Sequence, residues 1–149
     1  MKVVGDEQFD IAITMETLEH VPPKMVDGYL NAIAQCTSKY VFITVPNEKG
    51  IVFLGKWLAK RLLIRDAQRY SYGELVNATL GRLKHVSRNE HKGFDYEQLI
   101  GEVSRHFEIV HVSGHPFGIL PTCLCFGVGI IAKPRMLSAA PDQSQHSNP

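Results

Sequence analysis

Residues Phe9–Val21, with the sequence FDIAITMETLEHV, decide how this chain is interpreted. The first six, Phe9–Thr14, form a short apolar run bounded by acidic residues, which is typical of a buried parallel strand. Glu16, Glu19 and His20 follow directly, in the pattern E-x-x-E-H. Because open α/β sheets place their ligand groups at the carboxyl ends of strands, the pattern predicts a site that binds a cation or moves a proton. The alternative is structural, with solvated carboxylates at a helix start and His20 packed nearby.

A second strand and a connecting helix follow this segment. Apolar residues recur at helical spacing over Met25–Cys36, and Tyr40–Val45 is a β-branched and aromatic run that Pro46 stops. The distance between the two strands has room for one crossover helix, so we predict a right-handed β-α-β unit and an α/β fold. The strand ends that would carry the site are Met15–His20 and Pro46–Lys49.

The rest of the chain also alternates between helix and strand. We predict helical structure over Ile51–Leu83 and a helix from Tyr96 to His106, with Asp95 as its N-cap. Strands are expected at Phe107–Val112 and Phe126–Ala132; the second is expected to be buried and to follow the loop Gly114–Pro121, and burial is also expected for Cys123 and Cys125, which alternate as in a strand. The predicted domain therefore spans residues 1–135, and the tail, residues 136–149, lacks large apolar residues and is expected to be disordered.

Three of these segments together resemble the class I S-adenosylmethionine (SAM)-dependent methyltransferases. They are F-D-x7-L-E-H-V at the first strand, YVFITVPN at Tyr40–Asn47, and His91–Val110 with F-D-Y-E-Q-L and H-F-E-I-V. Within the family, the chain most resembles the O-methyltransferases of ubiquinone biosynthesis, whose corresponding segment also contains M-E-x-L-E-H-V. The resemblance covers roughly Phe9–Ala132. It implies the C-terminal part of a Rossmann-like methyltransferase sheet, with parallel strands, a final antiparallel strand, and helices on the faces.

The resemblance also implies roles for individual residues. Met15 and Glu16 would lie beside the methionine moiety of SAM. Glu16, Glu19 and His20 match the E-x-x-E-H that binds a divalent cation such as Mg²⁺ in related enzymes, and such a metal would hold and activate the acceptor hydroxyl. Without a metal, His20 would act as the general base, with Glu19 beside it in the catalytic site. His91 matches a further histidine ligand of RNA methyltransferases only loosely, and a surface or packing role is favoured for it.

One part of the family pattern has no counterpart. The glycine-rich loop after the family's first strand is missing, and Gly5-Asp6 cannot replace it, because a cofactor loop needs several glycines between a strand and a helix. We expect a partial domain that lacks the N-terminal cofactor-binding half and binds SAM weakly or not at all when alone. Three explanations are open: a fragment, a mis-started gene product, or one part of a split protein in which a partner supplies the missing half. The alternative function is a non-catalytic remnant or interaction module.

The composition is that of an ordinary globular protein, and the charge is uneven. Hydrophobic residues make up 44% and charged residues 21% of the 149 residues. No secretory leader is visible and three cysteines form no paired framework, so a cytoplasmic location is expected. Residues 51–92 contain nine Lys/Arg against three Asp/Glu, a net charge of +6 in a chain whose total is +1. An anionic partner should therefore bind this middle segment.

Ile51–Arg65 is the amphipathic part of that basic segment. One half of its helical wheel is apolar and the other carries cations, which suits peripheral contact with a membrane or a lid over a greasy acceptor. The alternative is a helix packed on the sheet with its cations outside. Nucleic acid is less favoured, because no RNA-binding motif accompanies the aromatic residues. The resemblance implies a methyltransferase, so together with this segment we predict O-methylation of a small-molecule, lipid-like or sugar acceptor.

Overall fold

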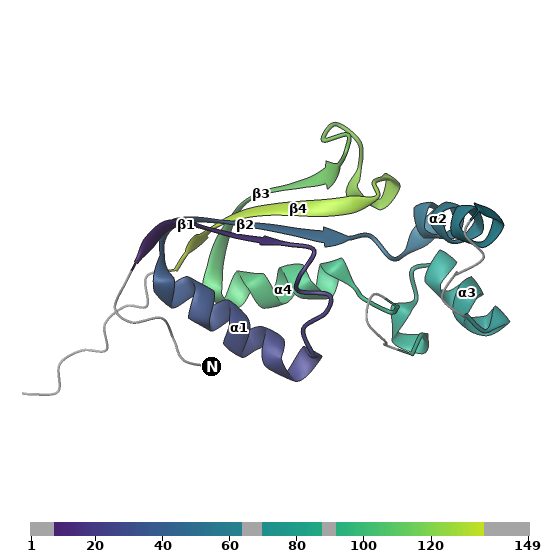
Figure 1. Cartoon of the computed structure of the whole chain (residues 1–149), viewed down its shortest axis with the longest axis horizontal. Coiled ribbons are helices and arrows are strands. Elements are labelled where there is room, and N and C mark those ends of the chain that lie inside the picture. Colours follow the sequence, from purple (N-terminus) through teal and green to yellow (C-terminus); the bar gives the residue numbers. More distant parts are fainter. Residues whose placement is uncertain (1–7, 64–69, 88–91, 136–149) are drawn as a thin grey trace, which may run out of the picture.

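The computed structural model describes residues 8–63, 70–87 and 92–135. Its centre is one four-stranded mixed sheet with the strand order β1-β2-β4-β3 (Figure 1). The strands are β1 (Phe9–Met15), β2 (Thr37–Pro46), β3 (Phe107–His115) and β4 (Gly127–Pro134). β1 and β2 pair in parallel, while β4 is antiparallel to both β2 and β3. β1, β2 and β3 therefore end at the same edge of the sheet, and β4 begins there.

Two helices cover one face of this sheet. α1 (Pro23–Cys36) connects β1 to β2, and α4 (Tyr96–His106) precedes β3; both lie below the sheet in Figure 1. Val41, Ile43 and Val45 alternate along β2 toward the helices, because successive side chains of a strand point to opposite faces. Burial of this face against the apolar stripes of the two helices forms the main core.

The opposite face of the sheet carries no helix among the described residues, and several of its apolar side chains are exposed. Ile11, Ile13 and Met15 alternate along β1 on this face, with Ile13 67% exposed, and Phe42 of β2 continues the surface. β1 is also an edge strand, so one row of its backbone groups has no neighbouring strand within the described part of the chain.

A group of smaller elements, here called the cap, lies beyond the carboxyl ends of the strands. It consists of α2 (Gly50–Leu63), α3 (Tyr72–Thr79) and the short 3-10 helix η1 (Leu83–His85). The cap has its own small hydrophobic cluster, built around Phe53, Ala78 and Leu83. A second 3-10 helix, η2 (Thr122–Leu124), lies in the β3–β4 connection and packs against α2.

Most local predictions are confirmed, with two corrections. The α/β fold with one antiparallel strand and the Asp95 N-cap are as expected; the Asp95 carboxylate accepts a hydrogen bond from the backbone N–H of Glu97 at 3.0 Å. Of the expected helices on the faces of the sheet, the two that the structure describes there, α1 and α4, share one face. β2 begins directly at the end of α1, without the expected gap. The proposed helical region is interrupted, and residues 64–69 and 136–149 lie outside the described residues.

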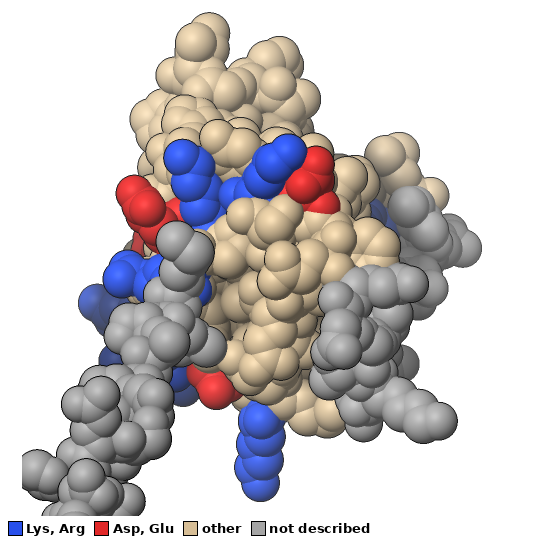
Figure 2. Space-filling model, turned by 90° about the vertical axis from the view of Figure 1, so that its left-hand side faces the viewer, with Lys and Arg blue, Asp and Glu red and all other residues tan. Residues whose placement is uncertain are grey.

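The β3–β4 connection is the other departure from expectation. Residues 116–132 contain no Lys, Arg, Asp or Glu, and the corresponding upper part of Figure 2 is uncharged. β4 is buried as predicted, but the lead-in loop exposes large apolar side chains, among them Phe117 and Ile119, the latter 96% exposed. Both Cys123 and Cys125 lie before β4: Cys123 is in η2 and exposed, whereas Cys125, the residue after η2, is buried.

Candidate functional site

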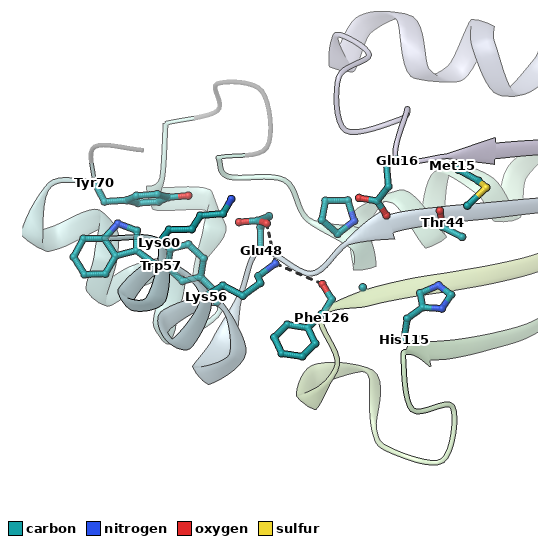
Figure 3. Close-up of a pocket in the computed structure, with 13 residues that line it drawn as sticks. Met15, Glu16, Thr44, Glu48, Lys56, Trp57, Lys60, Tyr70, His115 and Phe126 are labelled. Atoms are coloured by element: carbon teal, nitrogen blue, oxygen red, sulfur yellow. Dashed lines mark hydrogen bonds and ion pairs between the residues drawn. The ribbon is translucent and has the colours of Figure 1, made fainter. Parts of the chain in front are cut away.

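A pocket of about 600 Å³ opens where the sheet meets the cap (Figure 3). Its size is within the range of ligand sites for small molecules. Residues from the carboxyl ends of β1, β2 and β3, from the start of β4 and from α2 line it. They are Met15, Glu16, Thr44, Pro46, Glu48, Phe53, Lys56, Trp57, Lys60, Tyr70, His115, Phe126 and Gly127. The location agrees with the general rule that α/β sheets bind ligands beyond the carboxyl ends of parallel strands.

Met15 and Glu16 lie in this pocket, as expected from their place after the first strand. Met15 is the last residue of β1 and is largely exposed on the open face of the sheet. Glu16 has a φ of +46°, the left-handed region that side chains other than glycine rarely adopt, and its N–H donates to the Thr44 carbonyl at 2.9 Å. Among the described residues it is the only non-glycine with positive φ. Backbone strain of this kind, about 1 kcal/mol, is commonly found at functional sites.

Glu19 and His20 lie elsewhere, outside the pocket lining. The Glu19 side chain is completely buried, whereas the His20 side chain is 49% exposed, and their nearest charged atoms are 3.9 Å apart. The next turn is held by backbone hydrogen bonds, including His20 N–H to the Thr17 carbonyl at 3.0 Å. The E-x-x-E-H pattern is thus divided between an open pocket and a buried loop.

Because Glu16 is separated from Glu19 and His20, we next consider whether the three side chains can bind one metal ion. Within the described part of the chain, no three His, Cys, Asp or Glu side chains are grouped to hold one ion. Glu16, Glu19 and His20 therefore do not fit a shared Mg²⁺ site in this arrangement, and no chemical step is derived through a metal. His91, the weaker predicted ligand, lies outside the described residues.

The described residues do not build a complete SAM site either. Met15 and Glu16 form one wall, but the connection between β2 and α2 at the pocket, residues 47–49, contains no glycine, and Gly50 is the first residue of α2. A loop that cradles the phosphate- or carboxylate-bearing end of a cofactor needs several close glycines. No step through SAM is therefore derived from these residues, and their contribution is confined to the side of the pocket that would receive an acceptor.

His115 is the functional candidate that sequence reasoning missed. It is the last residue of β3 and pairs with Gly127 of β4, so its imidazole lies over the open face beside the pocket (Figure 3). A Cβ atom built on Gly129 would stand 2.9 Å from His115 Nε2, which shows that the ring lies directly on the β4 backbone. Glycine inside a strand often marks such a close approach. A signal was available, because β3 runs parallel to β1 and must end at the same edge.

Lys56 connects the pocket walls. Its ammonium donates to the Asn47 carbonyl at 2.7 Å, to Glu48 Oε1 at 3.0 Å and to the Phe126 carbonyl at 3.5 Å. These acceptors come from the β2–α2 loop and from the residue before β4. Lys56 therefore holds α2 against the sheet, and its charge is compensated by Glu48.

The loop after β2 divides into structural and pocket-lining residues. Asn47 is buried and its amide donates to the carbonyls of Thr122 and Cys125, at 3.3 and 3.0 Å. Lys49 is also buried and pairs with Asp95 and Glu97; burial acts to lower its pKa, but these two carboxylates raise it overall. Of the predicted segment, only Pro46 and Glu48 line the pocket.

Aromatic side chains form the cap side of the pocket. The rings of Phe53 and Tyr70 contact each other with centroids 5.1 Å apart, and Trp57 lies on the same helix with Arg61 over its ring at 5.3 Å. Burial, with the nearby carboxylates of Glu48 and Glu74, raises the pKa of Tyr70 far above its usual range. Its hydroxyl therefore keeps its proton at neutral pH and is available as a hydrogen-bond donor.

Exposed apolar side chains surround the pocket on two sides. α2 exposes Ile51, Leu58, Leu62 and Leu63, and the β3–β4 connection adds its own apolar residues. Among the described residues, no helix has both the length and the apolar character needed to cross a bilayer.

Comparison with known proteins gives a structural likeness alone. No protein-family model and no curated protein matches the sequence. Among solved structures, magnesium protoporphyrin IX methyltransferase from Synechocystis PCC 6803, determined with bound SAH, is similar with a TM-score of 0.42 and 12% identity. The match covers 89% of this chain and 48% of that protein, so the chain spans about half its length. At this level the likeness concerns the fold only, an α/β arrangement loosely similar to a methyltransferase.

Proposed function

We propose that this chain provides the acceptor-binding part of a SAM-dependent methyltransferase that methylates an oxygen of a small-molecule, lipid-like or sugar acceptor. The observation that carries the proposal is the pocket at the carboxyl ends of β1, β2 and β3, where Glu16 and His115 face one cavity. The sequence resemblance of the β1 and β2 segments to class I methyltransferases supports the same conclusion. SAM, when bound, supplies the methyl group.

In this proposal His115, and not His20, handles the acceptor proton. An oxygen nucleophile must lose its proton during transfer, and a histidine accepts protons near neutral pH. His115 lines the cavity, whereas His20 does not. Gly129 beneath the ring fixes where that ring can lie, so Gly129 is proposed as a positioning residue.

Methyl transfer by protein from its native cells tests the proposal. The tagged chain is purified together with whatever binds it, and tritiated SAM and a solvent extract of the same cells are supplied. Label should enter the extract above a boiled control. His115→Gln should lower the rate by roughly 10²–10⁴-fold, the usual contribution of a general base. His111→Gln, on the same strand but outside the pocket, is the matched control and should retain the rate. No incorporation above the boiled sample would rule out the methyltransferase function.

A second variant separates position from chemistry. Gly129→Ala keeps His115 but places a methyl group against its ring. We expect a reduced rate of methyl transfer and a shifted pH–rate profile. The melting temperature of the protein should not change. An unchanged pH–rate profile would show that the position of the His115 ring against Gly129 does not matter for the reaction.

The open edge of β1 favours a partner. Ile11 and Ile13 are exposed on a strand whose outer edge is unpaired among the described residues, and such edges recruit further strands. We propose that a polypeptide with the cofactor-binding half adds a strand to β1. The same observation supports the second candidate function, a non-catalytic interaction module. Hydrogen exchange separates them: strong amide protection of residues 9–15 in the native complex without any methyl transfer favours the module, whereas slow exchange together with transfer favours the enzyme.

Peripheral membrane contact through Ile51–Arg65 stays a proposal. Over the described part of the segment, residues 51–63, the exposed side chains of Leu58, Leu62 and Leu63 and the cations Lys60 and Arg61 support it. Sedimentation with liposomes, with and without anionic lipid, tests it. Absence of binding to both kinds of liposome would end the membrane proposal.

A further inference from the structure

We infer that the ligand of this pocket is an amphipathic anion, with an apolar body that lies against the rings of the cap and one carboxylate or phosphate group that binds Lys60. As the identity of the methyl acceptor, the inference rests on the function proposed above. As a statement about binding, it stands on the pocket residues and can be tested without SAM.

The charges at the cap end of the pocket leave one cation available. Lys56 and Lys60 are one helical turn apart on α2 and both line the cavity (Figure 3). Lys56 is already held by two carbonyls and by Glu48, which compensates its charge. Lys60 lines the same end of the pocket and, within the described part of the chain, takes part in no hydrogen bond or ion pair. Among the residues that the structure describes, Lys60 is therefore the one uncompensated ammonium at this end of the cavity.

The opposite end of the pocket has the opposite charge. Glu16 lies beyond the end of β1, and Met15, Thr44 and His115 are its neighbours in the lining. An anionic group placed there would meet a like charge, which is unfavourable at short range. The ligand is therefore oriented, with its anion at Lys60 and its uncharged end at Glu16 and His115. That end is where the proposed transfer would take place.

The walls between the two charges are apolar and largely aromatic. Phe53, Trp57 and Tyr70 lie on the cap side, and Phe126 with Pro46 on the sheet side. A volume of about 600 Å³ takes more than a headgroup, so an extended chain or ring system is needed to fill it. The Tyr70 hydroxyl, which stays protonated at neutral pH, is available as a second donor to the anion. The aromatic rings on the cap side can contact an apolar ligand body, and Lys60 can bind its anionic group. These groups suit an amphipathic anion better than a sugar, which would need more hydrogen-bonding partners.

Trp57 makes the test direct, because it is the only tryptophan of the chain and lines the pocket. Its fluorescence is titrated with decanoate, decyl phosphate and decanol, all below their micellar concentrations, and with inorganic phosphate. We expect saturable emission changes with both anions, roughly tenfold weaker binding of decanol, and no binding of inorganic phosphate alone, because a charge-assisted hydrogen bond contributes about one decade of affinity. The tighter of the two anions identifies the headgroup.

Variants of Lys60 decide the outcome. Lys60→Gln should remove the preference for anions over decanol, and Lys60→Arg should restore it. Lys84→Gln, an exposed lysine of η1 outside the pocket, is the matched control and should bind like the wild type. Equal binding of decanol and decanoate to the wild type, a preference that survives Lys60→Gln, or binding of inorganic phosphate as tight as that of decyl phosphate would overturn the inference.

The results separate this inference from the proposed function. Lys60-dependent binding of the anions by a protein that transfers no methyl group would retain the ligand class and remove the enzyme. Methyl transfer to a neutral acceptor at a rate unchanged by Lys60→Gln would retain the enzyme and remove the amphipathic anion as its ligand.

Discussion

The sheet with its two helices and the cap are held together in different ways. The sheet side has a large apolar core, in which residues from β2, β3, β4, α1 and α4 are buried. The cap has a small apolar cluster and depends on polar contacts, above all those of Glu74, which accepts hydrogen bonds from Ser71, Ser87 and Lys92. The sheet side is thus stabilised mainly by apolar packing, whereas polar contacts hold the parts of the cap to one another, so we expect the cap to unfold more easily than the sheet.

The largest expected effect is on the sheet core. Leu30 of α1 is fully buried there, and Leu30→Ala should lower the free energy of unfolding by about 3 kcal/mol through lost burial and the cavity left behind. Urea denaturation followed by circular dichroism measures it. A loss below about 1 kcal/mol would mean that this face is not the stabilising core.

The same substitution in the cap gives the matched comparison. Leu83→Ala removes the same atoms from the smaller cluster, so we expect a loss of about 2 kcal/mol confined to the cap. Hydrogen exchange should accelerate in residues 72–79 and remain slow in β4. Equal acceleration in both regions would show that cap and sheet unfold as one unit.

A pH-dependent effect should follow from the polar contacts of the cap. Hydrogen bonds from Ser87, Ser71 and Lys92 hold the pKa of Glu74 well below its usual range. Its stabilisation is therefore complete above the unfolded-state pKa of about 4.3 and is lost as pH falls toward the folded-state value. Glu74→Gln should be less stable than wild type at pH 7, and the difference in melting temperature should shrink below about pH 4. A difference that does not change with pH would argue against an ionised Glu74 as the centre of these contacts.

The smallest effect is expected on the open face of the sheet. Ile13→Thr should change the free energy of unfolding by less than about 0.5 kcal/mol, because the side chain is exposed. Self-association, measured by sedimentation velocity, should decrease if it occurs at all. A loss above 1 kcal/mol would show that this face is packed in the isolated chain.

Local patterns predicted the sheet unit well, and the site only in part. The positions of β1, α1 and β2 could be predicted from the spacing of apolar residues and from the prolines at element ends. The N-cap Asp95 could be predicted from the preference of aspartate for that position. Both kinds of signal act over a few residues. The burial of Glu19 could not be predicted, since the turn after Glu16 sends residues three positions apart to different environments. His115 was missed because it is about a hundred residues from the E-x-x-E-H pattern, and only the strand order places it beside Glu16.

Local patterns also could not predict that α1 and α4, the two described helices that pack on the sheet, share one face. Ile11, Ile13 and Met15 have the same apolar character as the residues that α1 covers, so alternation along a strand does not tell which face is buried. The bulk composition therefore predicted a normal core, while the structure divides the apolar residues between a core and an open surface.

The Lys56 ammonium binds several oxygens at once, as a metal ion does in a chelate. From α2, one cation binds three oxygens of two other stretches of chain, the β2–α2 loop and the residue before β4, and each oxygen restricts where the other two can be. In a chelate, the loss of one donor atom is tolerated because the remaining ones keep the ion in place, but removal of the ion releases every donor together. By the same logic, neutralising this single ammonium, for instance by acetylation, would free α2, the β2–α2 loop and the start of β4 in one event. The charge of one side chain thus links three stretches of chain that line the cavity.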